Sequence, residues 1–255
     1  MEGPLPAERR SRILELLRER GAVRVSALAR ELGASEITIR RDLAALAAAG
    51  AIERSHGGAV LPGRREPPIR PPERTAAKRA IGRAAASLVR PGETVFLNGG
   101  STTLEVFRHL AVPVTVVTNN VLAALEAVRD VELILLGGHV RADPAGRTVV
   151  GPFAAELLRR TFAGRAILGV GGLAAGAGVT TPVAAEAEIA TRMVEHTRGP
   201  VVIVADRSKL GAVTDFAICP LERVDVLVTD ADPPEAERRA LARAEIVIVD
   251  PGVSG

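Results

Sequence analysis

The feature that most constrains the fold of this chain is a series of apolar runs between residues 94 and 250. Helical patterns lie between most of them, and each run ends in glycine or polar turn residues. The runs are TVFLNGG, VTVVTNN, ELILLGG, AILGVGG, VVIVADRS, VDVLVTD and EIVIVD. Strands that are apolar throughout and alternate with helices are typical of a mostly parallel sheet covered on both faces. We therefore predict an α/β domain.

The first sixty residues show a helical spacing of apolar residues instead. A helix is predicted over residues 6–20, followed by a short strand or turn at 23–25. A second helix takes Ser26 as its N-cap, and a third takes Ser35 and ends at Gly50. Two helices joined by a turn that contains glycine indicate a helix-turn-helix.

The third predicted helix has a polar, basic face. If Ile39, Leu43 and Leu46 face the core, Thr38 and Arg41 lie on the opposite side. The N-terminal residues of such a helix reach base edges in DNA, and arginines contact phosphate or guanine. An ordinary amphipathic helix with solvated arginines explains the same periodicity. The candidate DNA-binding residues are Ser26, Ser35, Glu36, Ile37, Thr38, Arg40, Arg41, Arg54 and His56.

A β-hairpin is predicted directly after this helix, with its turn at residues 57–58. We interpret it as a wing, with Arg54 and His56 close to the DNA backbone or minor groove. Residues 62–73 are rich in proline and arginine and predict a semi-rigid linker. The predicted domains are a winged helix-turn-helix over 6–61, an effector-binding α/β domain over 74–232, and a helix and strand over 233–255 that complete it.

Charge is unevenly distributed along the chain. Residues 1–74 contain 14 arginines and 10 acidic residues, whereas the remainder has 19 basic and 20 acidic residues. A basic N-terminal segment favours double-stranded DNA as its partner.

The single cysteine, Cys219, excludes an internal disulfide, and no metal-ligand spacing, signal peptide or long apolar segment occurs. We expect a soluble cytoplasmic protein without a metal, and the absence of Tyr and Trp argues against single-strand binding.

Residues 98–103, NGGSTT, form the most informative strand end. Glycines allow backbone N–H groups to approach an anion, hydroxyls add donors, and a helix N-terminus adds partial positive charge. A simple capped turn explains the loop equally well, and the lysine of a nucleotide-hydrolysing loop is absent. Further polar groups follow other strands. The candidate effector-binding residues are Asn98, Gly99, Gly100, Ser101, Thr102, Thr103, Thr118, Asn119, Asn120, Gly137, Gly138, Glu186, Asp206 and Lys209.

Residues 169–174, GVGGLA, fit a dinucleotide-binding fingerprint that follows a strand. The following residues break the helix that should receive the pyrophosphate, so this alternative is weak.

The N-terminal pattern resembles the DeoR family of bacterial regulators. The resemblance rests on TIRRDL at 38–43 followed by HGGAV at 56–60, with glycines and apolar residues at matching positions from Ile13 onward. One departure is Ile37, where a polar residue is common in the family. The resemblance implies a DNA-binding winged helix-turn-helix.

The C-terminal part is similar to the effector domain of the same family. That domain is related to ribose 5-phosphate isomerase and glucosamine 6-phosphate deaminase, which implies a phosphorylated sugar as effector. Two departures are Gly171, where relatives often carry aspartate, and Ala190, where they often carry a basic residue. The matching motifs are NGGSTT at 98–103, TN at 118–119, LGG at 136–138, VG at 150–151, GVTTP at 178–182, EAE at 186–188 and DRSKLG at 206–211.

Together these observations predict a sequence-specific DNA-binding regulator. It acts as a repressor of sugar metabolism genes that a phosphorylated sugar releases, and it works as a homo-oligomer without enzymatic activity or a cofactor. One alternative is a sugar-phosphate isomerase or deaminase with an appended DNA-binding module, in which Glu186 or Glu188 acts with Asp206. The loss of a cleft carboxylate at Gly171 argues against it. A nucleotide-redox sensor rests on residues 169–174 alone.

Overall fold

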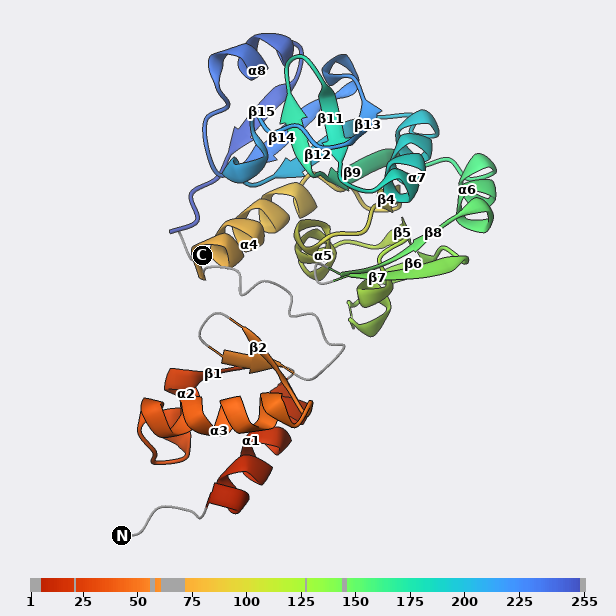
Figure 1. Ribbon diagram of the computed structural model, residues 1–255. Coiled ribbons are helices and arrows are strands. Elements are labelled where there is room, and N and C mark those ends of the chain that lie inside the picture. The colour runs from red at the N-terminus through yellow and green to blue at the C-terminus, as the bar shows by residue number, and fades with distance from the viewer. Residues whose placement is uncertain are drawn as a thin grey trace. The chain divides into compact units, whose positions relative to one another are not determined.

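The computed structural model describes residues 6–20, 22–55, 58–60, 72–126, 128–143 and 146–252 of the 255-residue chain. The chain divides into two compact units, Met1–Ile69 and Arg70–Gly255. Most of the predicted linker, together with His56, lies outside the described residues. Figure 1 shows the elements of both units by label.

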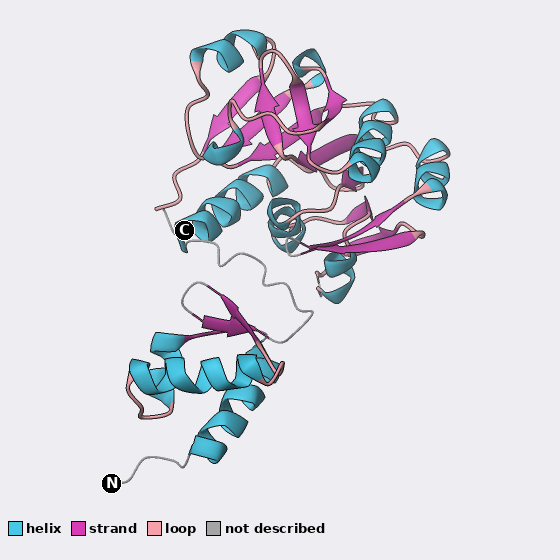
Figure 2. Ribbon diagram, viewed as in Figure 1, coloured by secondary structure: helices cyan, strands magenta, loops and turns pink. Residues whose placement is uncertain are grey.

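The first unit is a three-helix domain with a small antiparallel sheet (Figure 2). Its core consists of apolar side chains from all three helices, such as Leu16, Leu28 and Leu43. The predicted winged helix-turn-helix is confirmed. The elements are α1 (Pro6–Arg20), β1 (Ala22–Arg24), α2 (Val25–Glu31), α3 (Glu36–Ala48), β2 (Glu53–Ser55) and β3 (Gly58–Val60), with strand order β1-β3-β2.

The two predicted N-caps of this unit turn out differently. Ser35 caps α3, because its hydroxyl oxygen accepts a hydrogen bond from the backbone N–H of Thr38 at 3.2 Å. The prediction for Ser26 is wrong, since α2 begins one residue earlier, at Val25. The physical reason is packing: the Val25 side chain is buried in the core at the first turn, which leaves Ser26 exposed inside the helix.

In the described part of the second unit, each of the seven apolar runs forms a strand of one parallel sheet, as predicted. The order is β15-β14-β12-β9-β4-β5-β6, so β4 and β9 lie near the centre. The strands are β4 (Thr94–Leu97), β5 (Val114–Thr118), β6 (Val131–Leu135), β9 (Arg165–Gly169), β12 (Val201–Ala205), β14 (Val226–Thr229) and β15 (Glu245–Ile248).

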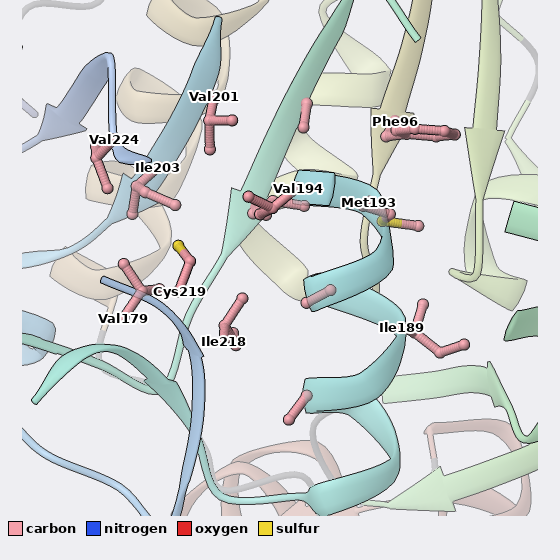
Figure 3. Packing of buried hydrophobic residues seen from close by; sticks show 14 of the residues in the cluster. Phe96, Val179, Ile189, Met193, Val194, Val201, Ile203, Ile218, Cys219 and Val224 are labelled. Carbon is pink, nitrogen blue, oxygen red and sulfur yellow. The ribbon is translucent and has the colours of Figure 1, made fainter. Parts of the chain in front are cut away.

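Helices bury both faces of this sheet. One core contains Ile81 and Phe107, from the first two helices of the unit. The other contains Phe96, Ile189 and Met193, which pack together in Figure 3. Between β5 and β6, where residues 121–128 have the apolar spacing of a helix, the chain instead forms a short 3-10 turn. The helical elements are α4 (Pro72–Ala86), α5 (Ser101–Arg108), η1 (Val121–Leu125), α6 (Pro152–Arg159), α7 (Ala184–Glu195), η2 (Arg207–Lys209), η3 (Leu221–Arg223) and α8 (Glu235–Ala240).

Two small sheets were not predicted. One is the antiparallel hairpin of β7 (His139–Asp143) and β8 (Gly146–Val150). The other joins β10 (Gly172–Ala174), β11 (Gly178–Thr181) and β13 (Phe216–Cys219). Because residues 172–174 form a strand that pairs with β11, no helix starts there to bind a pyrophosphate, and the dinucleotide alternative is wrong.

Candidate functional site

The outward face of α3 is the first candidate surface. Ile39, Leu43 and Leu46 are buried against the core, whereas Ile37 is 73% exposed. Arg40 and Arg41 are also exposed. This face therefore offers the apolar and basic groups that were predicted for it.

Two contacts organise the start of α3. The hydroxyls of Ser35 and Thr38 are hydrogen-bonded at 2.9 Å. Arg40 Nη2 donates to Glu36 Oε2 at 3.3 Å, and both side chains are about half exposed. Exposed ion pairs contribute little stability, so Arg40 can exchange this carboxylate for a phosphate at small cost. Of Arg54, the structure describes the backbone in β2, opposite Ala59 of β3.

Sequence reasoning missed the buried carboxylate of Asp42. Its oxygens accept hydrogen bonds from Arg9 Nε at 2.6 Å and from Arg10 Nε at 3.0 Å. Asp42 is 2% exposed, and the two arginines belong to α1. The carboxylate therefore fastens α1 to the helix that carries the exposed basic face. The sequence did contain a sign of this role, because a carboxylate next to Leu43 on the core side of a helix must be paired if it is buried.

A cavity of about 200 Å³ lies at the C-terminal ends of β4, β9 and β12 in the second unit. Ligands of open parallel sheets bind at this edge, beyond the carboxyl ends of the strands. The predicted residues that line the cavity are Asn98, Gly99, Gly100, Ser101, Thr102, Asn119, Glu186, Asp206 and Lys209.

The start of α5 forms one wall of the cavity. The helix begins at Ser101, and the first amides of a helix have no partner within it. Gly99 is required by a close approach, because a Cβ atom there would lie 2.1 Å from Thr148 Cγ2. Lys78 of α4 donates from Nζ to Ser101 Oγ at 3.0 Å. Both lysines of the chain, Lys78 and Lys209, line the cavity.

Two carboxyl groups lie in the same cavity. Asp206 accepts hydrogen bonds from the backbone N–H and the hydroxyl of Ser208. Burial, the largest influence, raises the pKa of Asp206, but the bonds to Ser208 and the charges of Lys78 and Lys209 together hold it below its ordinary value. Asp206 is therefore ionised at neutral pH.

Glu186, from the first turn of α7, is held by the β7–β8 hairpin. Its Oε1 accepts a hydrogen bond from Thr148 Oγ1 at 2.9 Å and forms an ion pair with Arg141 Nη1 at 3.4 Å. Glu188 is exposed and does not line the cavity.

The two cavity asparagines use their amide groups to hold the backbone. Asn98 Nδ2 donates to Gly169 O at 2.8 Å, and Asn98 Oδ1 accepts from Gly169 N at 2.8 Å. Asn119 bridges Gly99 N at 2.7 Å and Val149 O at 3.0 Å. These bonds fix the ends of β4, β8 and β9 around the cavity.

The other five predicted effector residues do not line the cavity. Thr103 donates to Asn98 O at 2.7 Å, and Thr118 accepts from Asn120 N at 3.0 Å. Asn120 caps η1 and donates to Gly100 O at 3.0 Å. These three residues therefore hold the backbone around residues 98–103 without lining the cavity. The remaining two, Gly137 and Gly138, are exposed.

Several lining residues lie outside the predicted effector set. Thr181 and Pro182, in the motif GVTTP before α7, were expected to close over the same cleft as Glu186, and they do line the cavity. Lys78 was signalled only by the scarcity of lysine, and Thr148 belongs to the unpredicted hairpin. At Gly171 a Cβ atom would lie 2.7 Å from Pro182 Cδ and 2.9 Å from Thr214 Oγ1, so neighbouring side chains occupy the space of a side chain there. The unpredicted lining residues are Lys78, Thr148, Gly169, Val170, Gly171, Val204, Ala205 and Ile218.

Among the residues that the structure describes, no helix is long and apolar enough to cross a membrane. The same residues contain no cluster of three or more His, Cys, Asp or Glu suited to a metal ion.

Comparison with known proteins gives two family matches. Residues 9–65 match the DeoR-like helix-turn-helix domain, and residues 73–231 match the DeoR C terminal sensor domain. The chain is 38% identical to the HTH-type transcriptional regulator GlpR of Haloferax volcanii, over 96% of this chain and 98% of that protein. It is 31% identical to the HTH-type transcriptional repressor GlcR of Bacillus subtilis, over 90% of each chain.

One solved structure to which part of this chain is similar is ribose 5-phosphate isomerase A from Methanocaldococcus jannaschii. It is 16% identical, with a TM-score of 0.38 over 54% of this chain and 55% of that chain. Similarity at this level says nothing about ligand or activity.

Proposed function

Since the chain belongs to the DeoR family of DNA-binding transcriptional regulators, we propose that it represses genes of sugar metabolism and that a phosphorylated sugar releases it from its operator. The observation that carries the effector part is the cavity in which both lysines meet the start of α5. An effector changes DNA affinity only if it binds the two conformations of the protein with different affinity.

The lysine end of the cavity suits a phosphate group. Unpaired amides at a helix N-terminus attract an anion, and the hydroxyls of Ser101 and Thr102 add donors. Lys78 and Lys209 supply two positive charges, of which Asp206 balances one. The remaining charge, with the helix terminus, matches one phosphate monoester better than two.

Glu186, which also lines the cavity, suits hydroxyl groups. It is fixed by Thr148 and Arg141, and a fixed carboxyl group accepts hydrogen bonds from sugar hydroxyls in a defined direction. Phosphate recognition by the lysines and the start of α5, together with hydroxyl recognition by Glu186, supports a sugar phosphate as the ligand.

The pKa of Asp206 argues against an isomerase or deaminase. A general acid or base works best with a pKa near the working pH, whereas the pKa of Asp206 lies below its ordinary value. The relatives are named as regulators. In this proposal the protein is a non-enzymatic regulator of the cytoplasm, and it acts as a homo-oligomer because two copies are needed to read two half-sites.

The test uses the full chain and a labelled DNA fragment from the region upstream of its own gene. Fluorescence anisotropy measures DNA affinity with each of a panel of sugar phosphates and with the matching unphosphorylated sugars. At least one phosphate should raise the dissociation constant of the DNA complex tenfold or more, and its unphosphorylated partner should not.

The variant Lys78→Gln removes a positive charge from the cavity, so its DNA affinity should no longer change when the sugar phosphate is added. Its DNA affinity without the sugar phosphate should stay the same, because Lys78 belongs to the α/β unit. Arg79→Gln is the matched control, since Arg79 is an exposed neighbour on the same helix. If no sugar phosphate changes the DNA affinity, and calorimetry detects no binding of these compounds, the effector proposal is wrong.

A further inference from the structure

Exposed apolar side chains concentrate at the β6 end of the second unit. We call this area the β6-edge surface. Phe153 is 78% exposed and Leu125 is 77% exposed, values far above those of core residues. The surface is formed by Leu125 of η1, Ile134 of β6, Val140 of β7, and Phe153 and Leu157 of α6.

The elements that carry these side chains are neighbours. The turn η1 contacts both β6 and β8, and α6 also contacts β8. Strand β8 is paired with β7 over its whole length. Figure 1 shows α6, the hairpin and β6 grouped at this end of the unit. The side chains therefore belong to one side of the unit rather than to scattered sites.

The area of this surface is that of a protein interface. With roughly 180 Å² for each fully exposed side chain, the exposed fractions amount to about 500 Å². An ordinary interface buries about 800 Å² per partner, including its polar rim. Apolar patches of several hundred Å² on a soluble protein mark interaction sites.

The charges on α6 favour a second copy of the chain as the partner. Phe153, Glu156, Leu157 and Arg160 follow a spacing of three and four residues, so they form one stripe along the helix and its C-cap. The stripe holds one acidic and one basic residue. When two such stripes meet antiparallel across a two-fold axis, Glu156 of each copy lies beside Arg160 of the other.

The present contact of these charges allows such an exchange. Arg160 Nε donates to Glu156 Oε1 at 3.0 Å, and the two side chains are 80% and 51% exposed. An exposed pair of this kind contributes little to stability, so both groups can rearrange toward a partner. A stripe of mixed charge also gives no attraction to DNA or to an anionic membrane.

We propose that the β6-edge surface is the face through which two copies of this chain dock about a two-fold axis. This inference rests on the proposed function in one respect: a regulator that reads two half-sites needs two copies. The β6-edge surface includes neither the residues that line the cavity nor the exposed face of α3.

Analytical ultracentrifugation of the full chain between 1 and 100 µM, concentrations chosen to bracket the micromolar range of weak interfaces, tests the proposal. The chain should associate as a dimer or a larger even-numbered assembly, and Phe153→Glu with Leu157→Glu should raise the dissociation constant at least 100-fold. Ile248→Glu is the matched control, since Ile248 is 50% exposed on β15 at the opposite edge of the sheet. It should associate like the unmodified chain.

Charge exchange gives a second measurement that does not depend on apolar residues. Glu156→Arg and Arg160→Glu should each weaken self-association. When the two single variants are mixed, they should form mixed dimers, because every charge then meets its opposite. Thermal melting monitored by circular dichroism checks that all variants are folded.

Three results would overturn the proposal: a monomeric unmodified chain, a Phe153→Glu, Leu157→Glu variant that associates normally, or dissociation caused by Ile248→Glu. Calorimetry with the panel of sugar phosphates separates this proposal from the effector proposal. If association depends on the β6-edge surface but none of these compounds binds or changes DNA affinity, the interface stands and the effector proposal fails.

Discussion

Replacement of Asp42 by alanine is expected to bring the DNA-binding unit close to unfolding and to leave the stability of the α/β unit unchanged. The carboxylate is buried and joins two arginines of α1 to α3. Loss of one partner of a buried ion pair costs about 3–5 kcal/mol. A unit of this size, at about 0.05–0.15 kcal/mol per residue, has a free energy of unfolding of roughly 3–9 kcal/mol. The variant therefore lies near its unfolding transition at room temperature.

The assay is urea denaturation followed by circular dichroism, combined with DNA-binding anisotropy. The transition of the DNA-binding unit should move to much lower urea concentrations and DNA affinity should fall, whereas the transition of the α/β unit should stay in place. Glu36→Ala is the matched control on the same helix. It removes an exposed ion pair and should cost less than about 1 kcal/mol.

An apolar replacement of the pair tests the same reasoning from the other side. Arg9→Met combined with Asp42→Leu should recover much of the lost stability, because well-packed apolar residues can replace a buried ion pair. If Asp42→Ala costs no more than Glu36→Ala, the carboxylate does not hold α1 to α3 and the argument is refuted.

Two further predictions concern the α/β unit. Gly99→Ala should weaken ligand binding at least tenfold by calorimetry, because the added Cβ atom would lie 2.1 Å from Thr148 Cγ2. Adding Thr148→Ser to this variant removes that methyl group and should restore binding. If binding is not restored, the steric explanation is wrong. Burial, the largest influence, raises the pKa of Glu93, but hydrogen bonds and charge from Arg165 and Arg90 hold it below its ordinary 4.5. The resulting stabilisation is present above about pH 4.5 and is lost as the pH falls through the folded-state pKa, so melting temperatures of Glu93→Gln should fall less steeply between about pH 5 and pH 3 than those of the unmodified chain. Equal slopes would show that Glu93 is not the group responsible.

Local patterns were sufficient to predict most of the elements. Each apolar run in the second unit became a strand; the inner strands such as β4, β9 and β12 are apolar because they are buried on both faces, whereas the edge strands β6 and β15 are partly exposed. The helix limits at Pro6 and Arg20 followed from periodicity, and Ser35 from cap chemistry. The β7–β8 hairpin was not predicted, because its residues are partly exposed and show neither a continuous apolar run nor a clear helical spacing.

The cavity could be predicted only in part. Glycines and hydroxyls at a strand end revealed residues 98–102, since the chemistry there is local. Lys78 and Thr148 reach the same cavity from distant elements, so their place depends on strand order, which periodicity does not give. Asn119 was found, but its use in holding Gly99 and Val149 depends on three-dimensional contacts.

Lys78 joins the cavity to the first helix of the α/β unit. This lysine contacts the ligand cavity from α4, the helix that begins at Pro72, where the chain arrives from the first unit. Six residues of helix separate the two points, a distance of about 9 Å along the axis. If a phosphate binds at Lys78, as proposed, it contacts the first helix of the α/β unit directly. The proposal then predicts that substitutions that stiffen or soften α4 change how strongly ligand binding alters DNA affinity.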